Sequence, residues 1–131
     1  PLAAVVVATV TGCGGGLIGT YRGDVRLMTG REESETEGHS LAEVRQRVAD
    51  DNRILTLLPG GRFKLKDKRS EVEGEWHLDG DTVVTLDDIG NGKPIPPGLR
   101  VERKFAIGDN GELIHGTSYN HYNLEEFYTK Q

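Results

Sequence analysis

The sequence predicts a mainly β protein, an antiparallel meander that closes into a small β-barrel or a strongly curved sheet. Apolar and polar residues alternate with a period of two through most of the chain, which is typical of strands with one dry and one wet face. Short turns rich in Gly and Asn separate these runs. A single stretch, residues 41–51, has instead the features of a short helix. Together these patterns favour a closed or curved antiparallel sheet.

The stretch from Arg62 to Leu86 is the centre of this prediction, with three strands around the only tryptophan, Trp76. Residues 62–66 and 71–78 alternate, and 67–70 connect them. Pairing across that connection makes every outer pair one of opposite charge, namely Lys66 with Glu71, Lys64 with Glu73 and Arg62 with Glu75. Each pair is weak, but a slip of one residue would turn the apolar face to water.

The turn at Asp79-Gly80-Asp81 decides which residues of the third strand face inward. We expect a three-residue loop, which keeps Val84 and Leu86 on the same face as Trp76.

The remaining elements follow from the same reasoning. In the first strand of the domain, residues 17–27, we expect Tyr21 and Val25 to share the inward face. Ser40 and Glu43 form a capping box before the helix, which is predicted to lie against the barrel or plug one end. The acidic stretch 29–40 lacks the spacing of a calcium loop and is interpreted as a solvated loop. The expected strands are 17–27, 53–58, 62–66, 71–78, 82–86, 99–107, 112–115 and 124–129, with a long loop at 87–98.

Composition limits the classes of function. The 131 residues are enough for one domain, and the net charge is −5. Basic residues are interleaved with acids, which argues against a nucleic-acid partner because phosphate binding needs a basic face. The single cysteine, Cys13, excludes an internal disulfide.

The chain opens with an uncharged apolar run, Leu2–Val10, that is too short to span a bilayer as a helix. Its length suits the apolar region of a secretory signal. It ends in Val10-Thr11-Gly12-Cys13, followed by three glycines. Because the chain begins at Pro1 without a methionine or a basic segment, we interpret the run as the remnant of a longer signal. The alternative is a buried strand with an inert core cysteine.

The Val10-Thr11-Gly12-Cys13 motif resembles the lipobox of bacterial lipoproteins. The resemblance implies cleavage before Cys13, a diacylglycerol anchor on its sulfur and a place in the bacterial cell envelope. It divides the chain into a signal-peptide remnant (1–12), a lipidated cysteine with a glycine tether (13–16) and one barrel domain (17–131).

Arg103 is a candidate ligand-binding residue because it falls on the apolar face of its strand. A guanidinium inside a small barrel can hold a carboxylate or phosphate through two hydrogen bonds. The alternative is that it reaches water at a strand end or pairs with an internal acid.

A second cluster of polar and aromatic residues lies at His115, Tyr119, His121 and Tyr122. Two histidines six residues apart, with Asp24 or Glu126 as a third ligand, could contribute to a metal site, which needs three or four ligands, or the histidines could serve a hydrolase. No nucleophile motif surrounds Ser118, so no catalytic residue is assigned. A polar loop whose rings pack on the sheet is the alternative.

The turn chemistry around Gly19-Thr20-Tyr21, Leu58-Pro59-Gly60-Gly61 and Gly74-Glu75-Trp76 resembles small lipocalin-like envelope lipoproteins, including the NlpE copper-resistance type. The Cys-x-x-Cys of that type is missing, so a copper or redox role is not implied. The resemblance implies a ligand in the barrel mouth, for which Arg103, Trp76 and Tyr119 are the candidate residues.

Three functions remain open. The first is a membrane-anchored, non-catalytic module that binds a small amphipathic ligand or an envelope partner, without a cofactor. The second is a hydrolase or metal-dependent enzyme that uses His115 and His121. The third is a filled structural barrel that acts through its surface.

Overall fold

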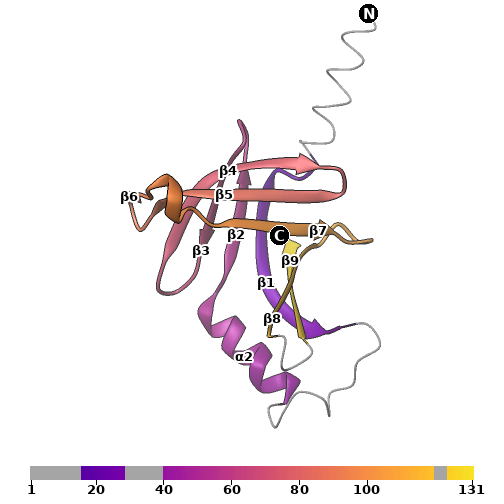
Figure 1. Ribbon diagram of the computed structural model, residues 1–131. Coiled ribbons are helices and arrows are strands. Elements are labelled where there is room, and N and C mark those ends of the chain that lie inside the picture. Colours follow the sequence, from indigo (N-terminus) through magenta and orange to yellow (C-terminus); the bar gives the residue numbers. More distant parts are fainter. Residues whose placement is uncertain (1–15, 29–39, 120–123) are drawn as a thin grey trace, which may run out of the picture.

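The computed structural model describes residues 16–28, 40–119 and 124–131, with the backbone alone for 117–119. These residues form one sheet, one α-helix and a short 3₁₀ turn, shown in Figure 1. The elements are β1 (Gly19–Leu27), α2 (Leu41–Asp51), β2 (Ile54–Leu58), β3 (Arg62–Lys66), β4 (Glu71–Asp79), β5 (Thr82–Gly90), β6 (Lys93–Pro94), η2 (Pro97–Leu99), β7 (Glu102–Ile107), β8 (Leu113–Tyr119) and β9 (Leu124–Lys130).

Eight strands close into an antiparallel barrel, which confirms the predicted fold class. Neighbouring strands follow the order β4-β3-β2-β1-β9-β8-β7-β5, and β5 pairs back with β4. The two-residue strand β6 extends the edge of β5, within the stretch predicted to be a long loop. Closure matters because it leaves few unpaired strand edges.

The register of β3 and β4 is the one that the alternation of charges predicts. Arg62 pairs with Glu75, Lys64 with Glu73 and Lys66 with Glu71. The inner face of the same pair of strands carries Phe63 opposite Gly74. Gly74 is required here, because a Cβ atom at this position would lie 1.9 Å from the Leu86 carbonyl oxygen and 2.8 Å from the Phe63 ring.

The turn between β4 and β5 differs from the prediction. Asp79 pairs with Thr82, so the loop holds two residues rather than three. Gly80 is the first of them and has φ +61°, as a type II′ turn requires at that position. One residue fewer in the loop reverses the face that each residue of β5 occupies.

The shorter turn therefore changes which residues of β5 enter the barrel. The prediction that Val84 and Leu86 share the face of Trp76 is wrong, since they pair with His77 and Glu75 on the other face. Val84 is nevertheless only 5% exposed there, whereas Leu86 is 37% exposed. The inner face of β5 instead carries three fully or almost fully buried residues, Val83, Thr85 and Asp87.

The start of β7 is also later than predicted. Leu99 and Val101, which fall in the predicted strand 99–107, are 71% and 48% exposed, and β7 begins at Glu102. Pro96 and Pro97 have no N–H to give to a ladder, and the chain makes the 3₁₀ turn η2 there instead.

The hydrophobic core fills one half of the barrel. Trp76 packs against this core, and its Nε1 donates to the Leu58 carbonyl oxygen at 3.0 Å. A Phe105–Tyr128 edge-to-face contact at 5.8 Å lies within it. The core consists of Tyr21, Leu55, Leu57, Phe63, Val83, Phe105, Leu113 and Tyr128.

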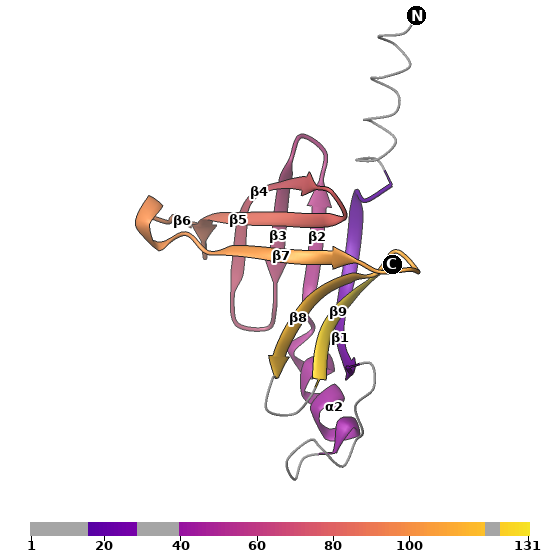
Figure 2. The same ribbon diagram turned by 45° about the vertical axis from the view of Figure 1, so that its right-hand side comes forward.

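Helix α2 covers the opposite end of the barrel, as predicted. Its N-cap Ser40 accepts a hydrogen bond from the Glu43 amide through Oγ at 3.1 Å. Its apolar stripe, Val44 and Val48, packs against Val25 and Leu124 in a second, smaller core. Figure 2 shows that the ends of β1, β8 and β9 extend towards this helix.

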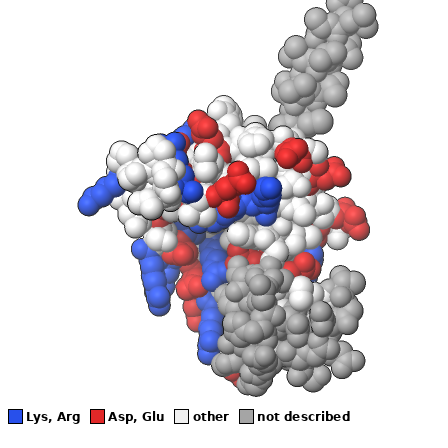
Figure 3. Space-filling view, viewed as in Figure 1, with Lys and Arg blue, Asp and Glu red and all other residues white. Residues whose placement is uncertain are grey.

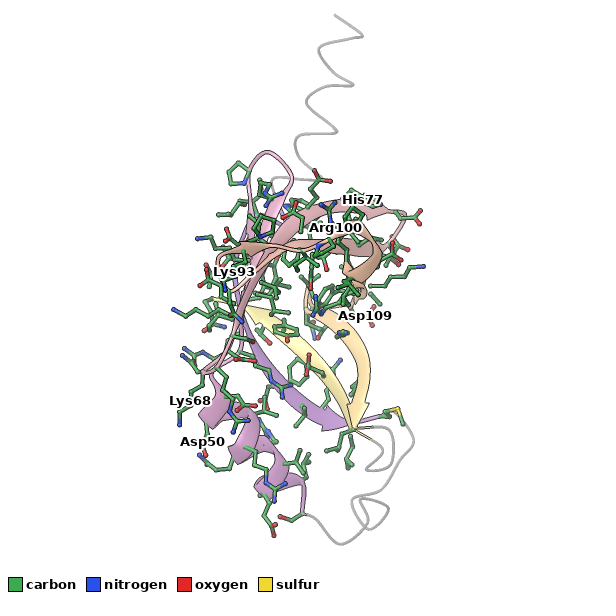
Figure 4. The ribbon with its side chains drawn as sticks, turned by 60° about the vertical axis from the view of Figure 1, so that its left-hand side comes forward. Asp50, Lys68, His77, Lys93, Arg100 and Asp109 are labelled. Atoms are coloured by element: carbon green, nitrogen blue, oxygen red, sulfur yellow. The ribbon has the colours of Figure 1, made fainter. Side chains whose placement is uncertain are left out.

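The connection between β3 and β4 is tied to the same helix. The Lys68 amide donates to the Asp51 carbonyl oxygen at 2.8 Å. Lys68 accordingly lies beside α2, next to Asp50 (Figure 4).

The outer surface mixes both signs of charge. On the face in Figure 3, Lys and Arg side chains are interspersed with those of Asp and Glu. In the described part of the chain, no helix has the length and apolar character needed to cross a membrane.

Candidate functional site

A polar chamber lies inside the barrel, between the aromatic core and the end that α2 covers. Its cavity has a volume of about 190 Å³ and is built by β3, β7, β8 and β9, with Arg53 from before β2 and Asp67 from after β3. The residues that line this chamber are Arg53, Leu65, Lys66, Asp67, Arg103, His115, Glu126 and Tyr128. Titratable side chains are rare inside so small a barrel, so their concentration in one place needs a physical account.

Arg103 enters the chamber from β7 and pairs with a buried acid. Its Nη1 donates to Asp87 Oδ1 at 2.5 Å, from the neighbouring strand β5. The two side chains are 22% and 3% exposed. The prediction that Arg103 faces inward is therefore confirmed, and the internal acid that was considered as its alternative partner is Asp87.

A second pair lies across the chamber, on β9 and the residue before β2. Asn52 ends α2 in the left-handed conformation, and Arg53 then enters the barrel. Arg53 forms a short ion pair with Glu126, which is buried. Glu126 Oε1 also accepts a hydrogen bond from the Tyr128 hydroxyl at 2.8 Å. Glu126 is thus held from two sides.

His115 lies at an irregular point of β8, where the register with β9 shifts between Ile114 and Gly116. Such bulges re-aim side chains. The ring packs edge-to-face on Phe105 at 5.0 Å, and neither nitrogen is hydrogen-bonded to a residue that the structure describes.

The electrostatics of the chamber favour a neutral His115. Burial lowers the pKa of its imidazole, and the negative charge of Glu126 opposes that effect. The nearby cations Arg103 and Arg53 lower it further. Burial, with Glu126 beside it, likewise raises the pKa of the Tyr128 hydroxyl. The two arginines and the two buried acids therefore balance, and His115 and Tyr128 add no charge near neutral pH.

A larger groove of about 460 Å³ lies between α2 and the outer face of β1. Arg45 and Asp24 form an ion pair in it, with Nη2 and Oδ2 2.7 Å apart. Both side chains are substantially exposed, and exposed pairs of this kind contribute little. The chamber is therefore the stronger candidate, because its ion pairs each contain a buried acid, Glu126 or Asp87.

Of the other residues proposed from the sequence, Trp76 packs on the core and does not line the chamber. Tyr119 ends β8, but its side chain is outside the described set, as are His121, Tyr122 and Cys13. Among residues 16–28, 40–119 and 124–131, no three His, Cys, Asp or Glu side chains gather as a metal site would require.

The sequence alone did not point to Arg53 or Asp87, and it offered Glu126 only as a possible third metal ligand, not as the partner of Arg53. The alternation Leu124-Glu125-Glu126-Phe127-Tyr128 does contain a signal, because Glu126 shares a face with Leu124 and Tyr128. Asp87 could not be predicted inside the barrel because the expected three-residue loop between β4 and β5 would have turned it outward.

A scan against protein-family models, a search of curated proteins and a search of solved structures found no match to this chain. The fold and the chamber alone therefore define the class, a small closed β-barrel with a polar cavity. This class is compatible with a binding module.

Proposed function

We propose that this protein is a non-catalytic binding module of the cell envelope that holds a small ligand in the polar chamber. Arg103 is the residue that carries the proposal. Its guanidinium lines a cavity, is partly accessible, and makes one hydrogen bond to the described residues, through Nη1. An arginine that serves only to pair with an acid inside a barrel would not need an open cavity beside it.

The aromatic core supports a division of the barrel into two parts. Phe63 and Phe105 are 1% and 0% exposed, and Trp76 packs on them, so that half has no room for a ligand. The polar half is therefore the place for a small ligand, and the filled half supplies the stability.

We further propose that Cys13 carries a lipid that anchors the barrel. Gly19, at the start of β1, pairs with Leu57 near the end of β2, whereas Arg53 of the chamber precedes the start of β2. The start of β1 lies at the end of the barrel away from α2 (Figure 1), and the pairing places the chamber nearer to α2. An anchor just before β1 would leave the chamber facing away from the membrane.

Native mass spectrometry tests the ligand. The chain would be extracted gently from the membranes of cells that produce it and compared with an Arg103→Leu variant that still folds. We expect a reproducible added mass in the wild type that is lost in the variant. A clean unliganded mass would contradict the proposal and favour a filled barrel that acts through its surface.

The anchor is tested separately, by fractionating cells that produce the wild type or a Cys13→Ser variant. We expect the wild type in the membrane fraction and the variant released from it. Equal distribution of the two would overturn the anchor without affecting the chamber.

A further inference from the structure

Arg103 has hydrogen-bonding capacity that the described residues do not use. A guanidinium has five N–H donors, and one of them, on Nη1, meets Asp87. No other hydrogen bond joins Arg103 to a described residue. His115, which lines the same cavity, also has no such bond. The chamber therefore offers a fork of cationic N–H groups beside a ring that can donate one more.

The acids of the chamber are, by contrast, already engaged. Glu126 accepts from Tyr128 at Oε1 and from Arg53 at Oε2. Asp87 accepts from Arg103 and does not line the cavity. Asp67, which also lines the cavity, accepts from the Arg69 and Ser70 amides at Oδ1. A ligand cation would thus find no carboxylate in the chamber that lacks a partner, whereas a ligand anion finds unused donors on Arg103. The asymmetry points to an anionic group on the ligand.

Thr85 adds a second sign of unmet hydrogen bonding beside Arg103. It is in register with Arg103 on the neighbouring strand and is fully buried. Its hydroxyl is the one buried side-chain polar atom without a partner in the described part of the chain.

The size and walls of the chamber limit the rest of the ligand. Its volume of about 190 Å³ is below the range of roughly 300–1,000 Å³ that is usual for drug-sized ligands. Leu65 provides an apolar patch in the wall, and the Phe105 ring lies behind His115. A molecule of a few carbons fits these limits.

Charge balance disfavours a ligand with more than one negative charge. The chamber holds Arg53 and Arg103 against Glu126 and Asp87, with Lys66 and Asp67 at its rim. Each added unit of buried charge without a partner is costly, so a dianion is disfavoured relative to a monoanion.

From these observations we propose that the chamber binds a short-chain monocarboxylate, with the carboxylate on the free N–H groups of Arg103 and on His115 and the alkyl tail against Leu65. The inference rests on the proposed function and names the ligand class for the same site.

Three probes of nearly the same size separate the possible charges: butyrate, 4-aminobutyrate and butylammonium. Isothermal titration calorimetry on the full chain would measure each. We expect saturable binding of butyrate, at least about tenfold tighter than binding of the other two, because the chamber has no free acid for an ammonium group.

The variants identify the site. Arg103→Leu should weaken butyrate binding by about tenfold or more, the usual effect of losing a charge-assisted hydrogen bond. Should this variant fail to fold, the double variant Arg103→Leu/Asp87→Leu removes both buried charges and serves in its place. Lys104→Leu is the matched control, because it removes the same charge from the outer face of the same strand, where Lys104 is 67% exposed. It should bind butyrate as the wild type does.

The outcomes distinguish the ligand class from the function. Tighter binding of 4-aminobutyrate or butylammonium, lost without Arg103, would overturn the monocarboxylate and leave the binding module in place. If no probe binds but native mass spectrometry still shows an added mass, the monocarboxylate is again overturned and the binding module is kept. If the Arg103→Leu variant still binds butyrate as the wild type does, the butyrate site lies elsewhere and the inference is overturned.

Discussion

Asp87 on β5 and Arg103 on β7 meet inside the barrel with Oδ1 and Nη1 2.5 Å apart, and the acid is 3% exposed. The pair links the filled half of the barrel to the chamber, because Asp87 follows Thr85 and Val83 on the inner face of β5. Because the pair is buried, removing one member leaves the other as an uncompensated charge inside the protein.

Removing Arg103 alone should therefore destabilise the protein strongly. In Arg103→Leu the buried Asp87 carboxylate loses its only described hydrogen-bond partner, for which we expect a loss of about 3–5 kcal/mol. The double variant Arg103→Leu/Asp87→Leu should be close to the wild type, since no unpaired charge remains. Urea unfolding of both variants measures the difference. Equal stabilities would mean that the ion pair is not buried in solution.

The Gly74 position should not tolerate a methyl group. In Gly74→Ala the new Cβ would lie 1.9 Å from the Leu86 carbonyl oxygen, a backbone atom that cannot move without opening the β4–β5 ladder. We expect a loss of more than about 2 kcal/mol in the free energy of unfolding, as for overpacked core sites. Gly98→Ala is the control, because no atom lies within 4 Å of its Cβ. Similar unfolding midpoints for the two variants would contradict this packing.

Ser40 should stabilise α2 through its cap. Ser40→Ala removes the hydrogen bond from the Glu43 amide, which typically costs about 0.5–2 kcal/mol. Ser40→Asp should retain the stability, because its carboxylate accepts the same bond near the positive end of the helix. Thermal unfolding followed by circular dichroism compares the three proteins. The cap would be irrelevant to stability if alanine and aspartate gave the same midpoint.

The pH dependence of stability should contain a contribution from His115. Its folded-state pKa is lowered below the unfolded value of 6.5, chiefly by burial. The unfolded chain therefore binds more protons between these two pKa values, and stability falls as the pH drops below about 6.5. The slope for one proton is at most about 1.36 kcal/mol per pH unit.

A His115→Gln variant isolates that contribution from those of the carboxylates. We expect its free energy of unfolding to change less than that of the wild type between about pH 7.5 and 5.5. Parallel curves for the two proteins would show that His115 titrates alike in the folded and unfolded chains.

The sequence predicts strand pairing well where a change of one residue in register or loop length would be penalised on both faces, and poorly where it would not. The β3–β4 register was predictable because both faces specify it, with Arg62, Lys64 and Lys66 opposite acids on one face and Phe63 opposite Gly74 on the other. The β4–β5 turn was not, because Asp79-Gly80-Asp81 fits loops of two or three residues. Because the loop length was ambiguous, Leu86 was predicted on the inner face of β5, which Asp87 occupies instead.

The chamber was predictable only in part for a related reason. Arg103 stood out as a charge on an apolar strand face, and the structure places it there. Alternation in β9 places Glu126 on the face of Leu124 and Tyr128, but its ion pair with Arg53, which follows α2, joins distant parts of the chain. Alternation within one strand carries no information about such partners.

The pairing of β1 with β9 has a consequence for the order in which the barrel assembles. Tyr21 and Lys130 are partners in this ladder but stand at nearly opposite ends of the domain's sequence. The hairpins from β2 to β5 need only local contacts, whereas the β1–β9 ladder cannot form until β9 has been synthesised. We expect pulse-labelled hydrogen exchange to show amides of the β2–β5 hairpins protected before those that join β1 to β9. Until that seam forms, the free edge of β1 is open to pairing with other chains, so slow closure at high protein concentration favours aggregation.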